Sequence, residues 1–266
     1  MIDRFGRVIN YLRISVTDRC NLRCKYCMPP AGVVLVRHED ILSFEEIDEV
    51  TRQGVSMGVS KVRLTGGEPL VRRGIVTLVD MLAGIEGIHD LAMTTNGTLL
   101  ADFAEELAAA GLMRVNVSLD AMDADRFAAM TGGGEVGAVL AGIDAAVAAG
   151  LTPVKINCVV SASSGERDAR DVAAFGRRKG LDVRFIHRMD LAAGSFSVVE
   201  GGTGGNCRLC NRLRLTSTGV VRPCLFSDLG FDARELGARE ALRRAVAAKP
   251  AFGTACSNGS MRGIGG

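Results

Sequence analysis

Short runs of apolar residues recur along the first 190 residues, and longer segments with helical spacing separate them. The runs predict β-strands at residues 11–17, 61–67, 91–96, 113–120, 153–160 and 182–187. The helical segments carry end signals: Ser43 stands three residues before Glu46, as in a capping box, and Gly150 and Gly180 each close a helix. Six strand–helix repeats predict an α/β fold, a partial (β/α)6 TIM-type barrel with fewer units than the closed barrel of eight.

Polar clusters follow the first four predicted strands. A cysteine-rich loop follows the first strand, "TGGEP" the second, "TTNG" the third and "SLD" the fourth. The carboxyl ends of parallel strands meet at one rim of a barrel, and chemistry in such folds sits there. The sequence therefore predicts that all four clusters lie on the same rim.

The alternation of strands and helices stops after residue 190. A Gly-rich stretch predicts a linker, a hairpin is expected to turn near Gly219, and a helix is expected over residues 233–250 before a loose tail. We therefore predict a catalytic core of residues 1–196 and a second module of residues 197–266.

Composition narrows the class of protein. The chain has 266 residues, 47% of them hydrophobic and 23% charged, which suits one large α/β domain with a small appendage. A formal net charge of +2 does not indicate nucleic-acid binding. No signal-peptide pattern and no run of about 18 apolar residues occurs, so we expect a cytoplasmic protein without a membrane partner. Thiols stay reduced in that compartment, so the eight cysteines are interpreted first as metal ligands or catalytic groups.

Three of these cysteines, Cys20, Cys24 and Cys27, have a C-x3-C-x2-C spacing. A structural zinc ion takes four ligands, whereas a [4Fe–4S] cluster held by three thiolates leaves one iron open to a substrate or cofactor. The alternative is half of a zinc site whose remaining ligand lies elsewhere.

A second triad, Cys207, Cys210 and Cys224, has the spacing C-x2-C-x13-C. Here the zinc alternative has a candidate fourth ligand in Cys256, so the spacing alone leaves the metal open. Cys158 alternates within an apolar strand and is predicted to be a core residue.

Several motifs together resemble a known family. "LRISVTDRCNLRCKYCMP", "KVRLTGGEPLVR", "TTNG", "NVSLD", "KINCVV", "VRFI", "CNRLRLTSTGVVRPCLFSD" and the closing double glycine are similar to the radical S-adenosylmethionine (radical SAM) enzymes, and within them to the GTP 3′,8-cyclases of the MoaA type that begin molybdenum-cofactor biosynthesis. The resemblance implies a lyase that converts GTP to (8S)-3′,8-cyclo-7,8-dihydroguanosine 5′-triphosphate. It also implies a barrel with a small C-terminal iron–sulfur module, two [4Fe–4S] clusters and S-adenosylmethionine.

In that family the first cluster binds and cleaves S-adenosylmethionine. The resulting radical takes H-3′ of GTP, and C3′ then attacks C8 of guanine. The second cluster holds the guanine through its open iron. The implied partners are GTP and a reductant such as flavodoxin or ferredoxin, with a homodimer possible.

The resemblance also assigns residues. The implied cluster ligands are Cys20, Cys24 and Cys27 for the first cluster and Cys207, Cys210 and Cys224 for the second. Positions that contact S-adenosylmethionine match Tyr26, Gly67, Ser118 and Met189, to which we add Gly66 for close backbone approach and Glu68 as an orienting carboxylate. Positions that hold GTP match Arg13, Arg63, Thr94, Lys155, Arg212 and Arg214, to which we add Arg184. The expected catalytic residues are Arg13, Arg63, Lys155, Gly265 and Gly266.

The chain departs from the family in four places. It is shorter between the sixth strand and the second C-x2-C, His187 and Arg188 replace a glutamate and a leucine, Cys256 is additional, and Gly263 separates Arg262 from the Ile-Gly-Gly end. These departures keep two alternatives open. One is a paralogue acting on a modified pterin, a tungsten cofactor or a peptide. The other is a non-enzymatic metal module such as a zinc scaffold or an electron carrier.

Overall fold

The computed structural model describes residues 1–28, 32 and 34–256 of the chain. Its described strands form one curved sheet in the order β6-β5-β4-β3-β2-β1-β7-β8-β9. The strands are β1 (Tyr11–Ser15), β2 (Lys61–Thr65), β3 (Asp90–Thr95), β4 (Arg114–Ser118), β5 (Lys155–Val160), β6 (Asp182–His187), β7 (Arg212–Leu215), β8 (Val220–Arg222) and β9 (Phe231–Asp232). Strands β1 to β6 are parallel, which confirms the predicted α/β partial barrel.

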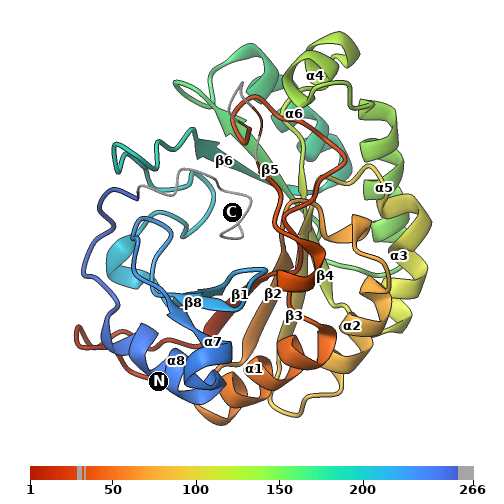
Figure 1. Ribbon diagram of the computed structural model, residues 1–266. Helices are drawn as coiled ribbons and strands as arrows, with labels where there is room; N and C mark the ends of the chain where they lie inside the picture. Colours follow the sequence, from red (N-terminus) through yellow and green to blue (C-terminus); the bar gives the residue numbers. More distant parts are fainter. Residues whose placement is uncertain (29–31, 33, 257–266) are drawn as a thin grey trace.

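Helices cover the outer side of this sheet (Figure 1). They are α1 (Phe44–Ser56), α2 (Ile75–Ala83), α3 (Leu100–Ala109), α4 (Ala124–Thr131), α5 (Val136–Ala148) and α6 (Arg167–Lys179), with α7 (Ala233–Leu236) and α8 (Ala238–Ala247) near the C-terminus. The capping box is confirmed: Glu46 N donates to Ser43 Oγ at 3.2 Å and Ser43 N to Glu46 Oε2 at 2.7 Å. None of the described helices is long and apolar enough to cross a bilayer.

The two faces of the parallel strands differ in chemistry. On β1, Leu12 and Ile14 are fully buried in the hydrophobic core that joins sheet and helices. Arg13, which lies between them, therefore projects from the inner face. A closed TIM barrel fills its interior with branched apolar side chains. Here the inner face carries polar side chains such as Arg13, and the interior contains a pocket instead of an apolar core.

The C-terminal part of the chain completes this same sheet. Strand β7 pairs in parallel with β1, and the predicted hairpin is confirmed as β7 and β8, with Gly219 at φ 93° in the turn. The predicted helix over 233–250 is interrupted at Gly237, which separates α7 from α8. The predicted domain boundary between residues 196 and 197 stays a prediction, and residues on both sides of it line one pocket.

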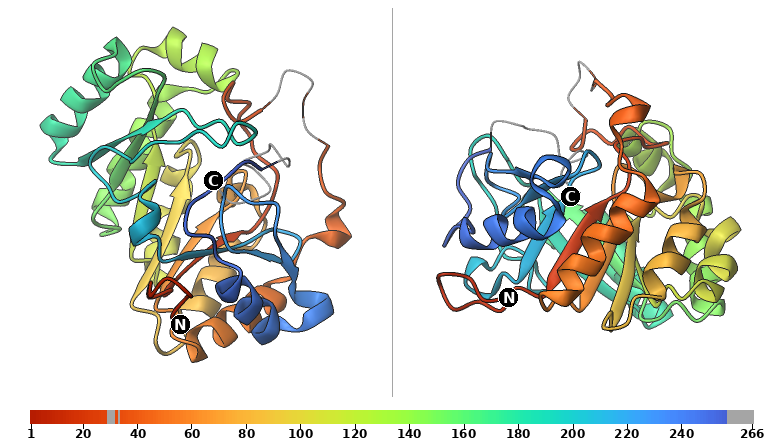
Figure 2. Two further views of the ribbon diagram at one scale, coloured as in Figure 1. Left: turned by 90° about the vertical axis from the view of Figure 1, so that its left-hand side faces the viewer. Right: turned by 60° about the horizontal axis from the view of Figure 1, so that its bottom comes forward.

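The Gly-rich stretch after residue 190 was predicted as a linker, and that prediction is wrong. Phe185 and Glu200 exchange backbone hydrogen bonds of 3.1 and 3.0 Å, so the stretch adds to the free edge of β6. The ring of Phe196 stacks on Phe226, with centroids 4.5 Å apart. The segment therefore bridges the gap between β6 and the C-terminal hairpin, as the two views in Figure 2 illustrate.

Candidate active site

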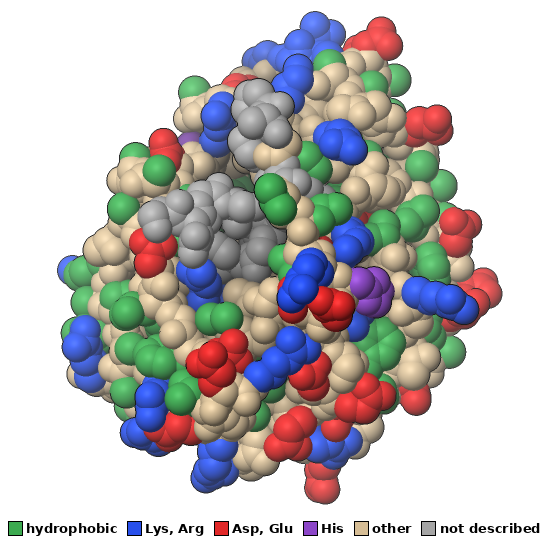
Figure 3. All heavy atoms as spheres, viewed as in Figure 1, with side chains coloured by type: hydrophobic (Ala, Val, Ile, Leu, Met, Phe, Trp, Pro, Cys, Tyr) green, Lys and Arg blue, Asp and Glu red, His purple; other side chains and the backbone are tan. Residues whose placement is uncertain are grey.

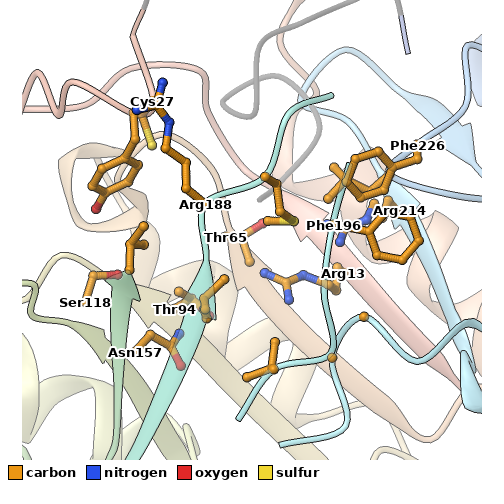
Figure 4. Close-up of a pocket in the computed structure, with 18 of the residues that line it drawn as sticks. Arg13, Cys27, Thr65, Thr94, Ser118, Asn157, Arg188, Phe196, Arg214 and Phe226 are labelled. Atoms are coloured by element: carbon orange, nitrogen blue, oxygen red, sulfur yellow. The ribbon is translucent and has the colours of Figure 1, made fainter. Parts of the chain in front are cut away.

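A cavity of about 340 Å³ opens at the carboxyl ends of the strands, a size that suits a small-molecule ligand. Both cysteine triads line it, and so do the ends of β2, β3 and β4, which places the predicted polar clusters on one rim. Arg13 points into the middle of the pocket (Figure 4). Cys27 and Ser118 lie toward one side of Arg13, and the Phe196–Phe226 pair lies toward the other.

The glycines of "TGGEP" have a packing role. A Cβ on Gly66 would lie 2.6 Å from the carbonyl oxygen of Thr17, and one on Gly67 would lie 2.1 Å from that of Arg19. The backbone of Gly67 also donates to Thr17 O at 2.7 Å. Both residues line the pocket, but the close approach that requires glycine is to the segment leading into the first cysteine loop, not to a ligand. The glycines thereby fix where that loop leaves β1.

Replacing Gly67 with alanine is expected to lower the free energy of unfolding of the apo-protein by about 1–3 kcal/mol, because the methyl group would overlap a backbone carbonyl. Gly137 is the matched control, since a Cβ there meets no atom within 4 Å and α5 is continuous around it. Gly137→Ala is expected to stabilise slightly. Urea unfolding of the two variants measures both effects, and equal midpoints would contradict the packing role of Gly67.

Glu68 is buried, only 1% exposed, so it is not a charge at a solvated strand end. Its carboxylate accepts hydrogen bonds from Leu70 N (3.0 Å), Thr95 Oγ1 (2.7 Å) and Asn96 N (2.6 Å). It is not among the residues that line the pocket. Asn96 is, and its side chain donates to Asn21 Oδ1 at 2.8 Å. Glu68 therefore positions the loop after β3 against the cysteine loop rather than facing a ligand directly.

Burial raises the pKa of Glu68 from 4.5 to about 7, although its hydrogen bonds act the other way. Between these two pH values the folded protein keeps the proton on Glu68, whereas the unfolded chain releases it. The free energy of unfolding therefore falls as the pH rises, by an amount on the order of 3 kcal/mol. Glu68→Gln is expected to remove this fall. Urea unfolding of both apo-proteins at about pH 5 and about pH 8 measures it, and identical pH dependences in the two proteins would rule the assignment out.

Tyr26 anchors the first cysteine loop to the sheet. Its hydroxyl donates to Asp120 Oδ2 at 2.5 Å, and Asp120 Oδ1 accepts from Val159 N at 2.8 Å. Burial and the neighbouring Asp120 carboxylate raise the pKa of Tyr26. Ser118 and Met189, which are predicted to contact S-adenosylmethionine, line the same pocket. Asp120 belongs to the quoted "SLD" motif, yet its role was missed because the sequence does not reveal its partner.

A row of arginines crosses the inner face of the sheet. Arg13 stands in register with Arg63 on β2 and with Arg214 on β7. Neighbouring strands lie about 4.8 Å apart, so three like charges are held side by side. Burial, followed by the charge of Arg214, lowers the pKa of Arg13. Burial and the charge of Arg212 lower the pKa of Arg214 to about 10. Such a row favours a polyanion in the pocket.

The other predicted cationic residues, Arg63, Lys155 and Arg184, do not line the pocket. Arg63 is 5% exposed and its Nη1 donates to Thr94 Oγ1 at 3.4 Å, while Thr94 itself lines the pocket. Lys155 on β5 pairs with Asp182 on β6 at 3.5 Å. The side chain of Arg184 lies within 4 Å of where a Cβ on Gly202 would be. The predicted catalytic Gly265 and Gly266 lie outside the described residues.

The second cysteine triad lines the same pocket as the first. Cys207 begins a 3-10 turn (Cys207–Leu209), Cys210 precedes β7 and Cys224 follows β8. Cys256 is fully buried behind the pocket wall, and its thiol donates to Asp228 Oδ1 at 3.2 Å. In the described part of the chain no three Cys, His, Asp or Glu side chains converge to ligate one metal ion. Cys158 is buried in the core, as predicted.

The described face in Figure 3 carries acidic and basic side chains interspersed, without a large field of one sign. This distribution agrees with the small formal net charge of +2. It gives no support to nucleic-acid binding through this face.

Comparison with known proteins identifies proteins of related sequence. Residues 14–175 match the radical SAM superfamily. The GTP 3′,8-cyclase of Geobacter sulfurreducens is 42% identical over 302 aligned positions, covering 94% of this chain and 93% of the relative. That of Moorella thermoacetica is 43% identical over 304 positions, with 94% of each chain covered. The aligned lengths exceed the 266 residues of this chain, so these relatives contain internal residues that it lacks.

Solved structures support the fold. SuiB of Streptococcus suis, bound to precursor peptide SuiA, gives a TM-score of 0.68 at 16% identity, covering 93% of this chain and 66% of that one. The protein anSMEcpe with bound AdoMet gives 0.65 at 14% identity, covering 91% and 81%. At these identities the structures establish the fold alone. From its sequence relatives, the chain belongs to the radical SAM superfamily and, within it, to the GTP 3′,8-cyclase family.

Proposed function

We propose that this chain is a GTP 3′,8-cyclase, a radical SAM lyase that joins C3′ and C8 of GTP to give (8S)-3′,8-cyclo-7,8-dihydroguanosine 5′-triphosphate, the first step of molybdenum-cofactor biosynthesis. The observation that carries the proposal is the composition of one pocket, which is lined by both cysteine triads and by Arg13, Arg212 and Arg214. The relatives named above supply the identity of the reaction.

The cysteines fit iron–sulfur clusters chemically. Burial and the neighbouring Cys27 raise the pKa of Cys24 to about 12, so its thiolate needs a bound cation to persist near neutral pH. Three thiols at the pocket wall leave room for a fourth, exogenous ligand. Cys20, Cys24 and Cys27 would hold the first [4Fe–4S] cluster, which with S-adenosylmethionine supplies the 5′-deoxyadenosyl radical. We assign a second cluster to Cys207, Cys210 and Cys224.

The remaining residues bind and orient the substrate. Arg13, Arg212 and Arg214 line the pocket and present guanidinium groups, which bind phosphate oxygens two at a time. The buried Nε of Arg212 has no hydrogen-bond partner among the described residues, which suits a ligand oxygen there. The Phe196–Phe226 pair offers an apolar wall beside this end of the pocket. A low-potential reductant such as flavodoxin or ferredoxin, and a homodimeric state, remain part of the proposal.

A different substrate is the second candidate, and Arg188 is the observation that favours it. The family has leucine at this position, whereas the Arg188 side chain here lines the pocket and points toward Cys27 (Figure 4). An added cation beside the first cysteine loop changes the charge that a substrate meets. A modified pterin, a tungsten cofactor or a peptide would then replace GTP.

The test is to reconstitute the protein without oxygen, reduce it, and incubate it with S-adenosylmethionine in the presence and absence of GTP. Mass spectrometry follows 5′-deoxyadenosine and any isomer of GTP. We expect GTP to stimulate 5′-deoxyadenosine formation and to be converted to a cyclised isomer. If 5′-deoxyadenosine forms slowly and at a rate that GTP does not change, the chain is a radical SAM enzyme but GTP is not its substrate.

A further inference from the structure

Lys249 is a buried cation at the second cysteine triad. It follows α8, is 2% exposed and lines the pocket. Its Nζ donates to the backbone carbonyl oxygens of Arg212 at 2.6 Å and Pro223 at 2.7 Å. Arg212 lies two residues after Cys210, and Pro223 immediately precedes Cys224. One ammonium group therefore joins the two chain segments that carry these cysteines.

The ammonium group of Lys249 also shares the pocket with the cysteines of the second triad. Lys249, Cys210 and Cys224 all line this pocket, and the charges of the two cysteines act on the ammonium group. An ammonium group has three donors and no acceptor. Two of these donors are used on the backbone beside Cys210 and Cys224, so Lys249 fixes the distance between the segments bearing the two cysteines.

A comparison with Arg7 shows what is unusual about the charge of Lys249. Arg7 is a second buried cation beside this triad, and it donates to Cys207 O at 2.7 Å and to Pro250 O at 2.6 Å. Asp3, fully buried, lies 2.6 Å from Arg7 and neutralises it. Figures 1 and 2 show the N-terminal segment that carries both residues beside the C-terminal helices.

Lys249 has no such acidic neighbour. Among the described residues no aspartate or glutamate forms an ion pair with it, and the opposite charges that act on it are those of Cys210 and Cys224. Burying a cation without a counter-charge is costly. The two cysteines supply that counter-charge only as thiolates, the form in which they bind metal.

We infer that Lys249 is a positioning residue and the built-in counter-ion of the second cysteine triad, holding Cys210 and Cys224 in place and stabilising the negative charge of the group they bind. This inference rests on the proposed second [4Fe–4S] cluster. A cluster with three thiolates carries net negative charge, and reduction adds one more. A fixed cation alongside therefore retains the cluster and raises its reduction potential.

The experiment uses the full chain with Cys20, Cys24 and Cys27 replaced by alanine, so that a cluster assembles only at the second triad. In this background Lys249→Met removes the charge and all three donors, and Lys249→Arg keeps the charge. Lys179→Met is the matched control, because Lys179 is an exposed lysine paired with Asp144 at 2.8 Å, far along the chain in α6. After anaerobic reconstitution, iron and sulfide per chain, the rate of iron loss to a chelator and the midpoint potential are measured.

We expect about four irons per chain with Lys249 intact. Lys249→Met should lose iron about tenfold faster or more, the size expected when a buried charged group and its hydrogen bonds are removed beside the triad. Its midpoint potential should be more negative, with Lys249→Arg close to the parent and Lys179→Met indistinguishable from it. In the chain with all cysteines, Lys249→Met should keep the first cluster and slow cleavage of S-adenosylmethionine, which separates a local effect from a failure to fold.

The outcomes are distinguishable. Unchanged iron retention and potential in Lys249→Met overturn the role of Lys249 and leave the second cluster standing. Loss of both clusters from the chain with all cysteines overturns a local role. No iron, or zinc without sulfide, in the background that retains Lys249 overturns the second cluster itself and the counter-ion role with it.

Discussion

Replacing Cys27 with alanine is expected to abolish 5′-deoxyadenosine formation, whereas replacing Cys256 with alanine is expected to leave it intact. Cys27 lines the pocket next to Tyr26 on the loop that Asp120 anchors. A cluster with only two protein thiolates left has no stable three-point attachment. Cys256 does not line the pocket and its thiol is directed at Asp228, so we expect it not to act as a ligand.

Iron and sulfide analysis, together with electron paramagnetic resonance after reduction, measures the result. Cys27→Ala should retain about half of the iron of the parent, bound at the second triad. Cys256→Ala should retain all of it, with a modest loss of stability because a buried side chain is truncated. Loss of the second cluster in Cys256→Ala would show that Cys256 is a fourth ligand. The second cluster would then have no open iron.

Replacing Arg13 with methionine is expected to weaken GTP binding by about 100-fold, because a guanidinium–phosphate contact contains two charge-assisted hydrogen bonds of about 1.5 kcal/mol each or more. The same replacement should not destabilise the apo-protein, since it relieves repulsion from Arg63, Arg212 and Arg214. We therefore expect Arg13 to strengthen GTP binding while it lowers the stability of the ligand-free protein. Equilibrium binding of GTP and urea unfolding are the two measurements.

Arg114 is the matched control for this prediction. It lies on β4, and its guanidinium makes a bidentate pair with Asp90 at 2.8 and 2.6 Å. Arg114→Met should destabilise the apo-protein, because it leaves the Asp90 carboxylate without its partner, and should change GTP affinity far less. If both variants lose stability equally, the arginine row is not a preformed anion site.

Much of the fold follows from local patterns in the sequence. The six parallel strands fall where apolar runs predict them, because strands buried on one side and bounded by glycine and polar residues have strong local signals. The capping box at Ser43 and the hairpin at Gly219 are equally local. The common rim follows from topology, since parallel strands must end at one edge.

The parts that the sequence does not reveal depend on distant contacts. The stretch after residue 190 reads as a linker, and only its backbone pairing with Phe185 and the ring of Phe226 give it structure. Lys249 looks like any lysine at the end of a surface helix until its two backbone acceptors are located. Glu68 reads as a strand-end charge, although it is a buried acceptor for three groups.

The strand order also has a consequence for biosynthesis. Strand β1 lies between β2 and β7, but β7 begins at Arg212, about 200 residues after β1 in the chain. At about 5–20 residues per second, a ribosome leaves one edge of β1 without its neighbour for roughly 10–40 s. Exposed strand edges recruit other chains. Slowed or truncated translation before Arg212 should therefore yield aggregated nascent chains, which makes the last parallel strand the closing step of co-translational folding.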